Sequence, residues 1–245
     1  MNTPIFTRFL YYKNDVVLSL VTSILHADIE QSLFWGYELY FSGFKKEVFD
    51  ILLFTFEEIM EKKLPKEIKS FLEKKKLEWE KNMNKHSIIA TMIHNIATYN
   101  NIKFSVKPKK MIYAVYREKD VSQYKTKTCT ELDIPHYRYL RKVCKFSIIE
   151  MGIELIKDYD FLKPYFNSNI SREQLREYYF YHWEYCAYQT PIWKKRIENC
   201  KGKIDVENKK IIFENDEMAD LFYQEYGYEP DEQPIEITNR TIGKK

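Results

Sequence analysis

Residues 29–63, IEQSLFWGYELYFSGFKKEVFDILLFTFEEIMEKK, decide the fold of this chain. Two runs of apolar and aromatic residues with helical spacing, residues 29–42 and 45–63, lie on either side of Gly43. Glycine adopts the left-handed conformation that ends many helices without a steric penalty. The stretch therefore predicts two antiparallel helices joined by a very short turn, the helical counterpart of a β-hairpin.

Helical spacing continues on both sides of this hairpin. Residues 15–26 predict a helix before it, and residues 85–99 predict another after it. Between them, Pro65 suits the first turn of a helix over residues 66–83, because the N–H that proline lacks has no partner there. Residues 1–100 are thus predicted to form an N-terminal helical layer, either a bundle or stacked helical hairpins.

The rest of the chain divides into three parts. Residues 101–135 lose the helical pattern and are interpreted as a basic linker or surface loop. Residues 136–228 predict a C-terminal helical half, with helices at 136–158, 172–188, 191–199 and 214–226. Residues 229–245 contain two prolines and no period, so they are expected to be an extended tail.

Two local signals refine the C-terminal half. Asn169 or Ser171 is expected to cap the helix that starts near residue 172, because both side chains accept hydrogen bonds from a first turn. Residues 203–213 are predicted to form a β-hairpin in which Asn208 takes a positive φ. The predicted fold class is therefore mainly α, with a small β-hairpin near the C-terminus.

Composition excludes several enzyme classes. The 245 residues include only 6 glycines, and no GxxxxGK[ST] or GxGxxG pattern occurs, which argues against P-loop and Rossmann proteins. HExxH, GxSxG and CxxC patterns are also missing from the sequence. We therefore predict no cofactor and no metal, and the sequence favours a non-enzymatic protein.

The cysteines and the apolar runs bear on the compartment. The chain has 4 cysteines, no stretch of 18 apolar residues, and a start without a basic segment followed by an apolar one. We expect a protein without membrane association in a reducing compartment, where its cysteines are thiols.

A few residues carry the remaining chemical possibilities. Glu38 lies in an otherwise apolar stretch, so it is a candidate acid or base, although a helix-edge or hydrogen-bonded carboxylate is the favoured interpretation. His182 and Cys186 have the i, i+4 spacing of two metal ligands, but no comparable further ligands accompany them. An enzyme with a new type of site would require Glu38, His94 or His182 to converge with other polar groups in a deep pocket.

Charge is distributed unevenly along a chain whose formal net charge is +3. Residues 101–127 carry a local charge of +6, and residues 205–236 carry −9. The basic segment also contains Phe104 and three tyrosines, and basic grooves with aromatic residues can bind single-stranded nucleic acid. Its candidate nucleic-acid contacts are Lys103, Lys107, Lys109, Lys110, Arg117, Lys119, Lys125 and Lys127.

Aromatic residues are unusually frequent, with 20 Tyr, 16 Phe and 4 Trp. An AT-rich genome explains most of this excess. Residues 178–197 place aromatic side chains on several helix faces, so they are either packed on all sides or partly available to a partner. Packing is favoured, and the candidate interaction residues are Trp35, Tyr37, Tyr40, Tyr178, Tyr181, Trp183 and Trp193.

Two segments carry a family resemblance: residues 28–44, DIEQSLFWGYELYFSGF, and residues 181–234, which begin YHWEYCAYQTPIWKKR. They resemble an uncharacterised protein family of nucleocytoplasmic large DNA viruses, the giant viruses of the mimivirus type. The resemblance implies a viral protein in the host cytoplasm, at the viral factory, or in the virion, and it carries over no catalytic residue.

The sequence therefore predicts a non-enzymatic interaction or scaffold protein of such a virus, with viral or host proteins, or a second copy of itself, as partners. The alternative is an accessory nucleic-acid-binding subunit in viral replication or transcription, acting through residues 101–127.

Overall fold

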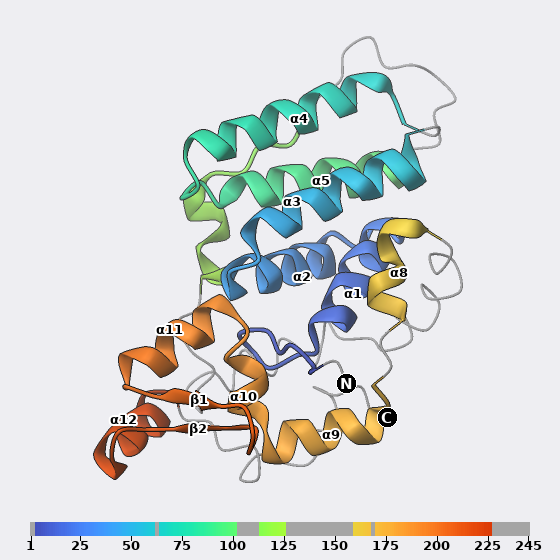
Figure 1. Cartoon of the computed structure of the whole chain (residues 1–245). Coiled ribbons are helices and arrows are strands. Elements are labelled where there is room, and N and C mark those ends of the chain that lie inside the picture. The colour runs from blue at the N-terminus through green and yellow to red at the C-terminus, as the bar shows by residue number, and fades with distance from the viewer. Residues whose placement is uncertain (1–2, 62–63, 102–112, 126–158, 168–169, 227–245) are drawn as a thin grey trace.

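The computed structural model describes residues 3–61, 64–101, 113–125, 159–167 and 170–226. Within these ranges the chain is mainly helical, with one two-stranded antiparallel sheet near the C-terminus. Figure 1 shows α1 to α5 as a stack of helices, and α9 to α12 with the β-hairpin as a second group beside it. The predicted fold class is confirmed. The predicted helix at 136–158 and tail at 229–245 lie outside the described residues.

The N-terminal stack follows the sequence pattern closely. Its helices are α1 (Lys13–Leu25), α2 (Ile29–Ser42), α3 (Lys45–Phe54), α4 (Lys66–Lys81) and α5 (Ser87–Asn101). Asp28 caps α2 by accepting a hydrogen bond from the Gln31 backbone N–H, and Gly43 ends that helix with φ 105°. The helical hairpin predicted around Gly43 is therefore confirmed.

The end of α3 departs from a regular α-helix. Residues 55–60 form a π-helical turn, η1 (Thr55–Met60), where the prediction was a continuous α-helix to residue 63. The Thr55 hydroxyl donates to the carbonyl of Ile51 at 2.7 Å, which satisfies a backbone acceptor at the point where the hydrogen-bond pattern changes.

The short helix α8 (Lys163–Phe166) lies beside α1 (Figure 1) and packs on the N-terminal stack. The C-terminal group contains α9 (Arg172–Tyr181), α10 (Trp183–Ala187), α11 (Pro191–Asn199), β1 (Lys203–Asp205), β2 (Lys210–Ile212) and α12 (Asp216–Tyr226). Ser171 and Gln174 form a reciprocal capping box at the start of α9, which confirms Ser171 as the cap. A kink at His182, with φ −141°, divides the single helix expected over residues 172–188 into α9 and α10.

The hairpin turn also differs in one detail from the sequence expectation. Lys209, not Asn208, takes the positive φ, at 52°. The backbone N–H and the side-chain amide of Asn208 both donate to the Asp205 carboxylate, at 3.0 and 2.8 Å. These bonds hold Asn208 in an Asx-type turn, so the left-handed conformation falls on the following residue.

The described residues form two hydrophobic cores, and each core combines residues from distant parts of the chain. The larger core joins α1 to α5 with Leu162 and with Val121 and Tyr124 of the 3-10 helix η2 (Glu118–Tyr124). The smaller core joins α9 to α12 and the hairpin with Phe6, Leu10 and Tyr12. The start of the chain therefore belongs to the core of the C-terminal group.

The N-terminal segment joins the two groups through specific hydrogen bonds. The Trp193 indole N–H donates to the carbonyl of Thr7 at 3.0 Å, and the Thr190 hydroxyl donates to the carbonyl of Phe6 at 2.5 Å. A Cβ built on Gly43 would lie 2.6 Å from the Pro191 ring, so the end of α2 and the start of α11 are in close contact. These contacts fix the C-terminal group against α2.

Among the described residues, no helix combines the length and the apolar character needed to cross a membrane.

Candidate functional site

Most of the aromatic residues proposed as partner contacts are core residues. Five of the seven, Trp35, Tyr37, Tyr40, Trp183 and Trp193, are buried. Their polar atoms bind within the chain; for example, the Tyr37 hydroxyl donates to the His86 carbonyl at 2.9 Å. As interaction residues these five were wrong, because surrounding helices that the local sequence pattern does not show bury them from every side.

Tyr181 is different, because its side chain is exposed. Its residue exposure of 74% is the highest of any large hydrophobic residue in the described part of the chain. It is the last residue of α9, directly before the kink at His182. The neighbouring Tyr178 is half-buried, so this end of α9 keeps both of the predicted interaction residues that are not in the core.

The β-hairpin turn holds this end of α9 in place. The Lys209 ammonium group donates to the Tyr178 hydroxyl at 3.2 Å and lies 4.9 Å from the centre of the Tyr178 ring. One ring nitrogen of His182, Nδ1, lies 3.0 Å from the carbonyl of Lys209. Tyr181 therefore extends from a helix end that is fixed by the hairpin.

Further exposed or half-buried groups lie on these two elements. The Phe180 ring lies beside that of Tyr181, tilted by 45° with a centroid distance of 6.3 Å, and the Arg176 guanidinium lies 5.4 Å from the Phe180 ring. Val206, at the start of the hairpin turn, is 66% exposed. We call Tyr178, Phe180, Tyr181, Val206 and Lys209 the α9–hairpin surface. Aromatic and aliphatic groups beside cations on a rigid support are typical of protein-binding surfaces.

The structure places only part of the basic candidate set. Lys103, Lys107, Lys109, Lys110 and Lys127 lie outside the described residues. Lys119 and Lys125 are exposed, and the Arg117 guanidinium pairs with Asp120 at 3.2 Å.

The three tyrosines of the basic segment are not free to stack on bases. Tyr113 stacks on Phe71, Tyr116 bonds to His94, and Tyr124 stacks on Tyr37. These contacts occupy the three tyrosines, whereas Phe104 lies outside the described residues.

Glu38 is a buried structural carboxylate. Its two oxygens accept hydrogen bonds from Arg8 Nε at 2.9 Å and from the Phe9 backbone N–H at 3.0 Å. Both the Arg8 and Glu38 side chains are almost completely buried. Glu38 thus anchors the N-terminal segment on α2, rather than lying on a helix edge or facing a pocket.

The histidines and cysteines considered above have separate surroundings. His94 contacts Tyr116, whereas His182 contacts the hairpin turn. Cys186 is buried in the smaller core, and burial raises the pKa of its thiol, so it is not a reactive thiolate at neutral pH. Within the described ranges, His, Cys, Asp and Glu side chains do not form any group of three or more that could hold a metal ion.

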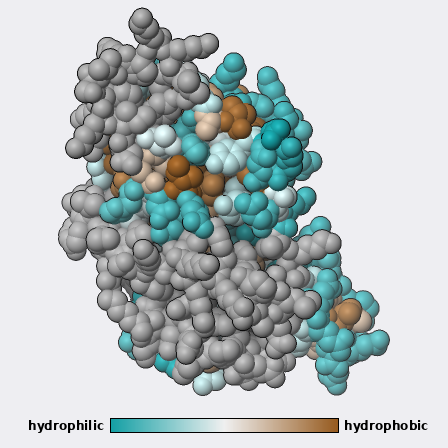
Figure 2. Space-filling model, turned by 180° about the vertical axis from the view of Figure 1, so that it is seen from behind, coloured by the Kyte–Doolittle hydropathy of each residue, from teal (hydrophilic) through white to brown (hydrophobic). Residues whose placement is uncertain are grey.

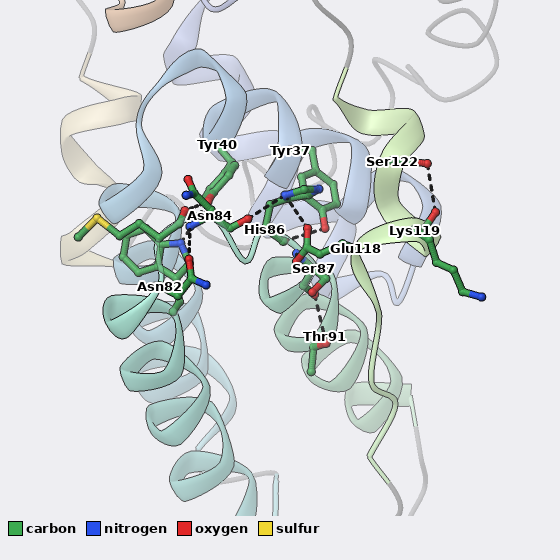
Figure 3. A network of polar contacts seen from close by, with 12 residues as sticks. Tyr37, Tyr40, Asn82, Asn84, His86, Ser87, Thr91, Glu118, Lys119 and Ser122 are labelled. Atoms are coloured by element: carbon green, nitrogen blue, oxygen red, sulfur yellow. Dashed lines mark hydrogen bonds and ion pairs between the residues drawn. The ribbon is translucent and has the colours of Figure 1, made fainter.

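Sequence reasoning missed a polar network between α2, α5 and η2 (Figure 3). The Glu118 carboxylate accepts a hydrogen bond from the Ser87 backbone N–H at 3.0 Å, at the first turn of α5. Its other oxygen lies 2.6 Å from Nδ1 of His86, whose carbonyl accepts from Tyr37. A carboxylate near a helix N-terminus is favourable, but a partner 31 residues away leaves no local signal in the sequence.

Comparison with known protein families, curated proteins and solved structures finds no significant match to this chain.

Proposed function

We propose that the protein is a non-enzymatic interaction or scaffold protein of a large DNA virus, acting in the host cytoplasm at the viral factory or in the virion. Its partners are other viral or host proteins. The α9–hairpin surface is the proposed contact. The viral assignment rests on the resemblance of residues 28–44 and 181–234 to a family of those viruses.

The exposed ring of Tyr181 is the observation that carries this proposal. A tyrosine buries a large apolar area in an interface and still has a hydroxyl for a hydrogen bond. Binding costs less conformational entropy when the contact residue is held by a rigid support. The capping box of α9 and the contacts of Tyr178 and His182 with Lys209 provide that support.

The surroundings of the polar candidates favour this function over catalysis. Glu38 pairs with Arg8 in the core, and His182 is bonded to a backbone carbonyl that shapes the α9–hairpin surface. Each of these groups has a contact that stabilises the fold, and they belong to different parts of the molecule. A scaffold function uses the fold that they stabilise and requires no reactive group.

The nucleic-acid alternative has weaker support. Lys119 and Lys125 remain exposed in the basic segment, and exposed lysines can bind phosphate groups. Changing Lys107, Lys109 and Lys110 together to Glu tests it. Binding to DNA and RNA that is unchanged at low salt would exclude this alternative.

The direct test is a pull-down of the tagged protein from virus-infected cells, with and without nuclease. We expect a defined set of proteins that remains bound after nuclease treatment. Loss of every partner on nuclease treatment would contradict the proposal and would favour the basic segment as the binding site.

A further inference from the structure

An open cleft lies where α11 meets the β-hairpin, which runs beside that helix (Figure 1). Its volume is about 780 Å³, within the range of about 300–1,000 Å³ that is usual for ligand pockets. Tyr188 after α10, Glu198 on α11 and both strands contribute to its walls. In the hairpin, Lys203 pairs with Ile212 at the end away from the turn, and both residues line the cleft. The cleft therefore belongs to the open end of the hairpin.

The cleft offers apolar surface that the core does not use. Ile211 is buried in the smaller core, whereas the next residue, Ile212, is 52% exposed. Neighbouring side chains of a strand point to opposite faces, so Ile212 is directed away from that core. Ile204 and Phe213 are half-buried and also line the cleft. Seen from behind, this end of the molecule is mainly hydrophilic and carries an exposed hydrophobic group, at the lower right of Figure 2.

Two polar contacts connect the walls of the cleft. The Tyr188 hydroxyl donates to the Glu198 carboxylate at 3.0 Å, and the Lys194 ammonium lies 4.0 Å from the same carboxylate. Lys201, in the loop before β1, pairs with Glu214 after β2 at 2.7 Å. Both carboxylates of the lining therefore have partners within the chain, and the walls are connected before any ligand binds.

Lys203 is the remaining charged residue of the lining. Its side chain is exposed, and within the described ranges it makes no ion pair. Asp205, two residues further along β1, is bonded to Asn208 of the turn. Side chains of directly paired residues lie next to each other on one face of a sheet, so the ammonium group of Lys203 is beside the exposed Ile212. The chemistry complementary to this pair is a carboxylate next to a large apolar group.

We propose that the cleft binds an acidic peptide segment of a partner protein, in which a large apolar side chain adjoins a carboxylate. Lys203 pairs with the carboxylate, and Ile212 and Phe213 contact the apolar side chain. Most of the charged lining residues are exposed, so the cleft covers one side of a ligand, as suits a peptide segment more than an enclosed small molecule.

This inference goes beyond the proposed function and does not rest on it. The α9–hairpin surface includes Val206 and Lys209 at the hairpin turn, whereas the cleft is at the opposite end of the strands. The two surfaces share no residue.

The test is isothermal titration calorimetry of the full-length protein with an unlabelled, end-capped peptide of sequence GSFDFDSG. We expect saturable binding at low salt that weakens as salt is added, because exposed charges are screened. Two control peptides separate the charge from the apolar groups. One has both aspartates changed to asparagine and the other has both phenylalanines changed to serine, and each should bind more weakly than the probe.

Two variants change the cleft at exposed positions, where the fold does not depend on the side chain. Lys203→Glu replaces attraction by repulsion and should weaken binding at least roughly fivefold. Ile212→Ser removes the apolar contact and should weaken binding roughly tenfold. Lys74→Glu is the matched control for charge, because Lys74 is exposed on α4 at the other end of the molecule (Figure 1), and it should leave binding unchanged.

Three results would overturn the proposal, with folding checked by circular dichroism. The first is no saturable binding of the probe to the wild type. The second is binding that Lys203→Glu or Ile212→Ser leaves unchanged, or that Lys74→Glu weakens equally. The third is a wild-type dimer in size-exclusion chromatography that Lys203→Glu dissociates, because a second copy would then be the occupant. The pull-down from infected cells depends on the α9–hairpin surface, so either proposal can fail without the other.

Discussion

Arg8 and Glu38 form a buried ion pair, with Arg8 Nε 2.9 Å from Glu38 Oε2, between the N-terminal segment and α2. Arg8 also donates from one terminal nitrogen to the carbonyl of Tyr124 at 2.9 Å. The Arg8 backbone N–H donates to the hydroxyl of Ser42 at 2.8 Å. One residue near the start of the chain therefore holds α2 and η2 together, and the adjacent Thr7 accepts from α11.

Removal of one partner of this pair leaves the other charge buried. We expect Glu38→Ala to lower the free energy of unfolding by about 3–5 kcal/mol, the usual effect of breaking a buried ion pair. We expect the double variant Arg8→Met with Glu38→Leu to lose less free energy of unfolding than the sum of the losses of Arg8→Met alone and Glu38→Leu alone. Urea unfolding measures both quantities. Additive effects of the two changes would contradict the paired arrangement.

The close approach of Gly43 to Pro191 leads to a second prediction about the stability of the fold. Gly43→Ala forces a side chain into a conformation with φ 105° and into contact with the Pro191 ring. The left-handed backbone alone costs an alanine about 1–2 kcal/mol. We therefore expect a loss of at least this size in urea unfolding. In a Pro191→Gly background, which removes the Cβ and the ring, the loss caused by Gly43→Ala should shrink only by the part that comes from the steric contact. Disappearance of the whole loss would contradict the backbone argument.

We expect His94 to make the stability of the protein depend on pH. Burial lowers the pKa of His94 from 6.5 in the folded chain, so the unfolded chain takes up the proton first as the pH falls. The contribution of neutral His94 is complete above about pH 6.5 and decreases below it, by at most about 1.4 kcal/mol per pH unit.

Thermal unfolding of the wild type and of His94→Gln between pH 7.5 and 5 measures this effect. The other histidines titrate in both proteins, so the difference between the two curves isolates His94. We expect the wild type to lose more stability than the variant on acidification. Parallel curves would show that His94 is not the titrating group.

Cys186 is expected to resist alkylation in the native protein. Burial raises the pKa of its thiol, and both accessibility and thiolate formation are needed for reaction. Iodoacetamide at pH 8 followed by mass spectrometry should leave Cys186 unmodified in the folded chain and modified in urea. Rapid native labelling would mean that the smaller core opens readily.

The sequence predicted those elements whose signals are local. Gly43 ends α2, Ser171 caps α9, and Pro191 begins α11, because each residue acts on the turn that contains it. The kink at His182 and the positive φ at Lys209 were not predicted. The kink lies where His182 and Tyr178 contact Lys209 of the hairpin, which is more than 25 residues away, and the position of the positive φ follows the side-chain bonds of Asn208 to Asp205.

The candidate site was predictable only in part. Tyr181 and Trp183 lie two residues apart in the same aromatic run, yet one is exposed and the other is in the core. Helical periodicity cannot separate them, since α9 ends between them and the direction of the chain changes.

Tyr181 provides the most direct test of the proposed function. The measurement is the recovery of nuclease-resistant partners in the pull-down with Tyr181→Ala, compared with wild type and with Leu77→Ala. Leu77 on α4 is a matched control, because it is also exposed and lies away from α9.

We expect Tyr181→Ala to weaken partner binding by about 2 kcal/mol, or roughly 30-fold in Kd, as for a central interface residue. Leu77→Ala should leave recovery unchanged. Full recovery of nuclease-resistant partners by a folded Tyr181→Ala variant would contradict the account.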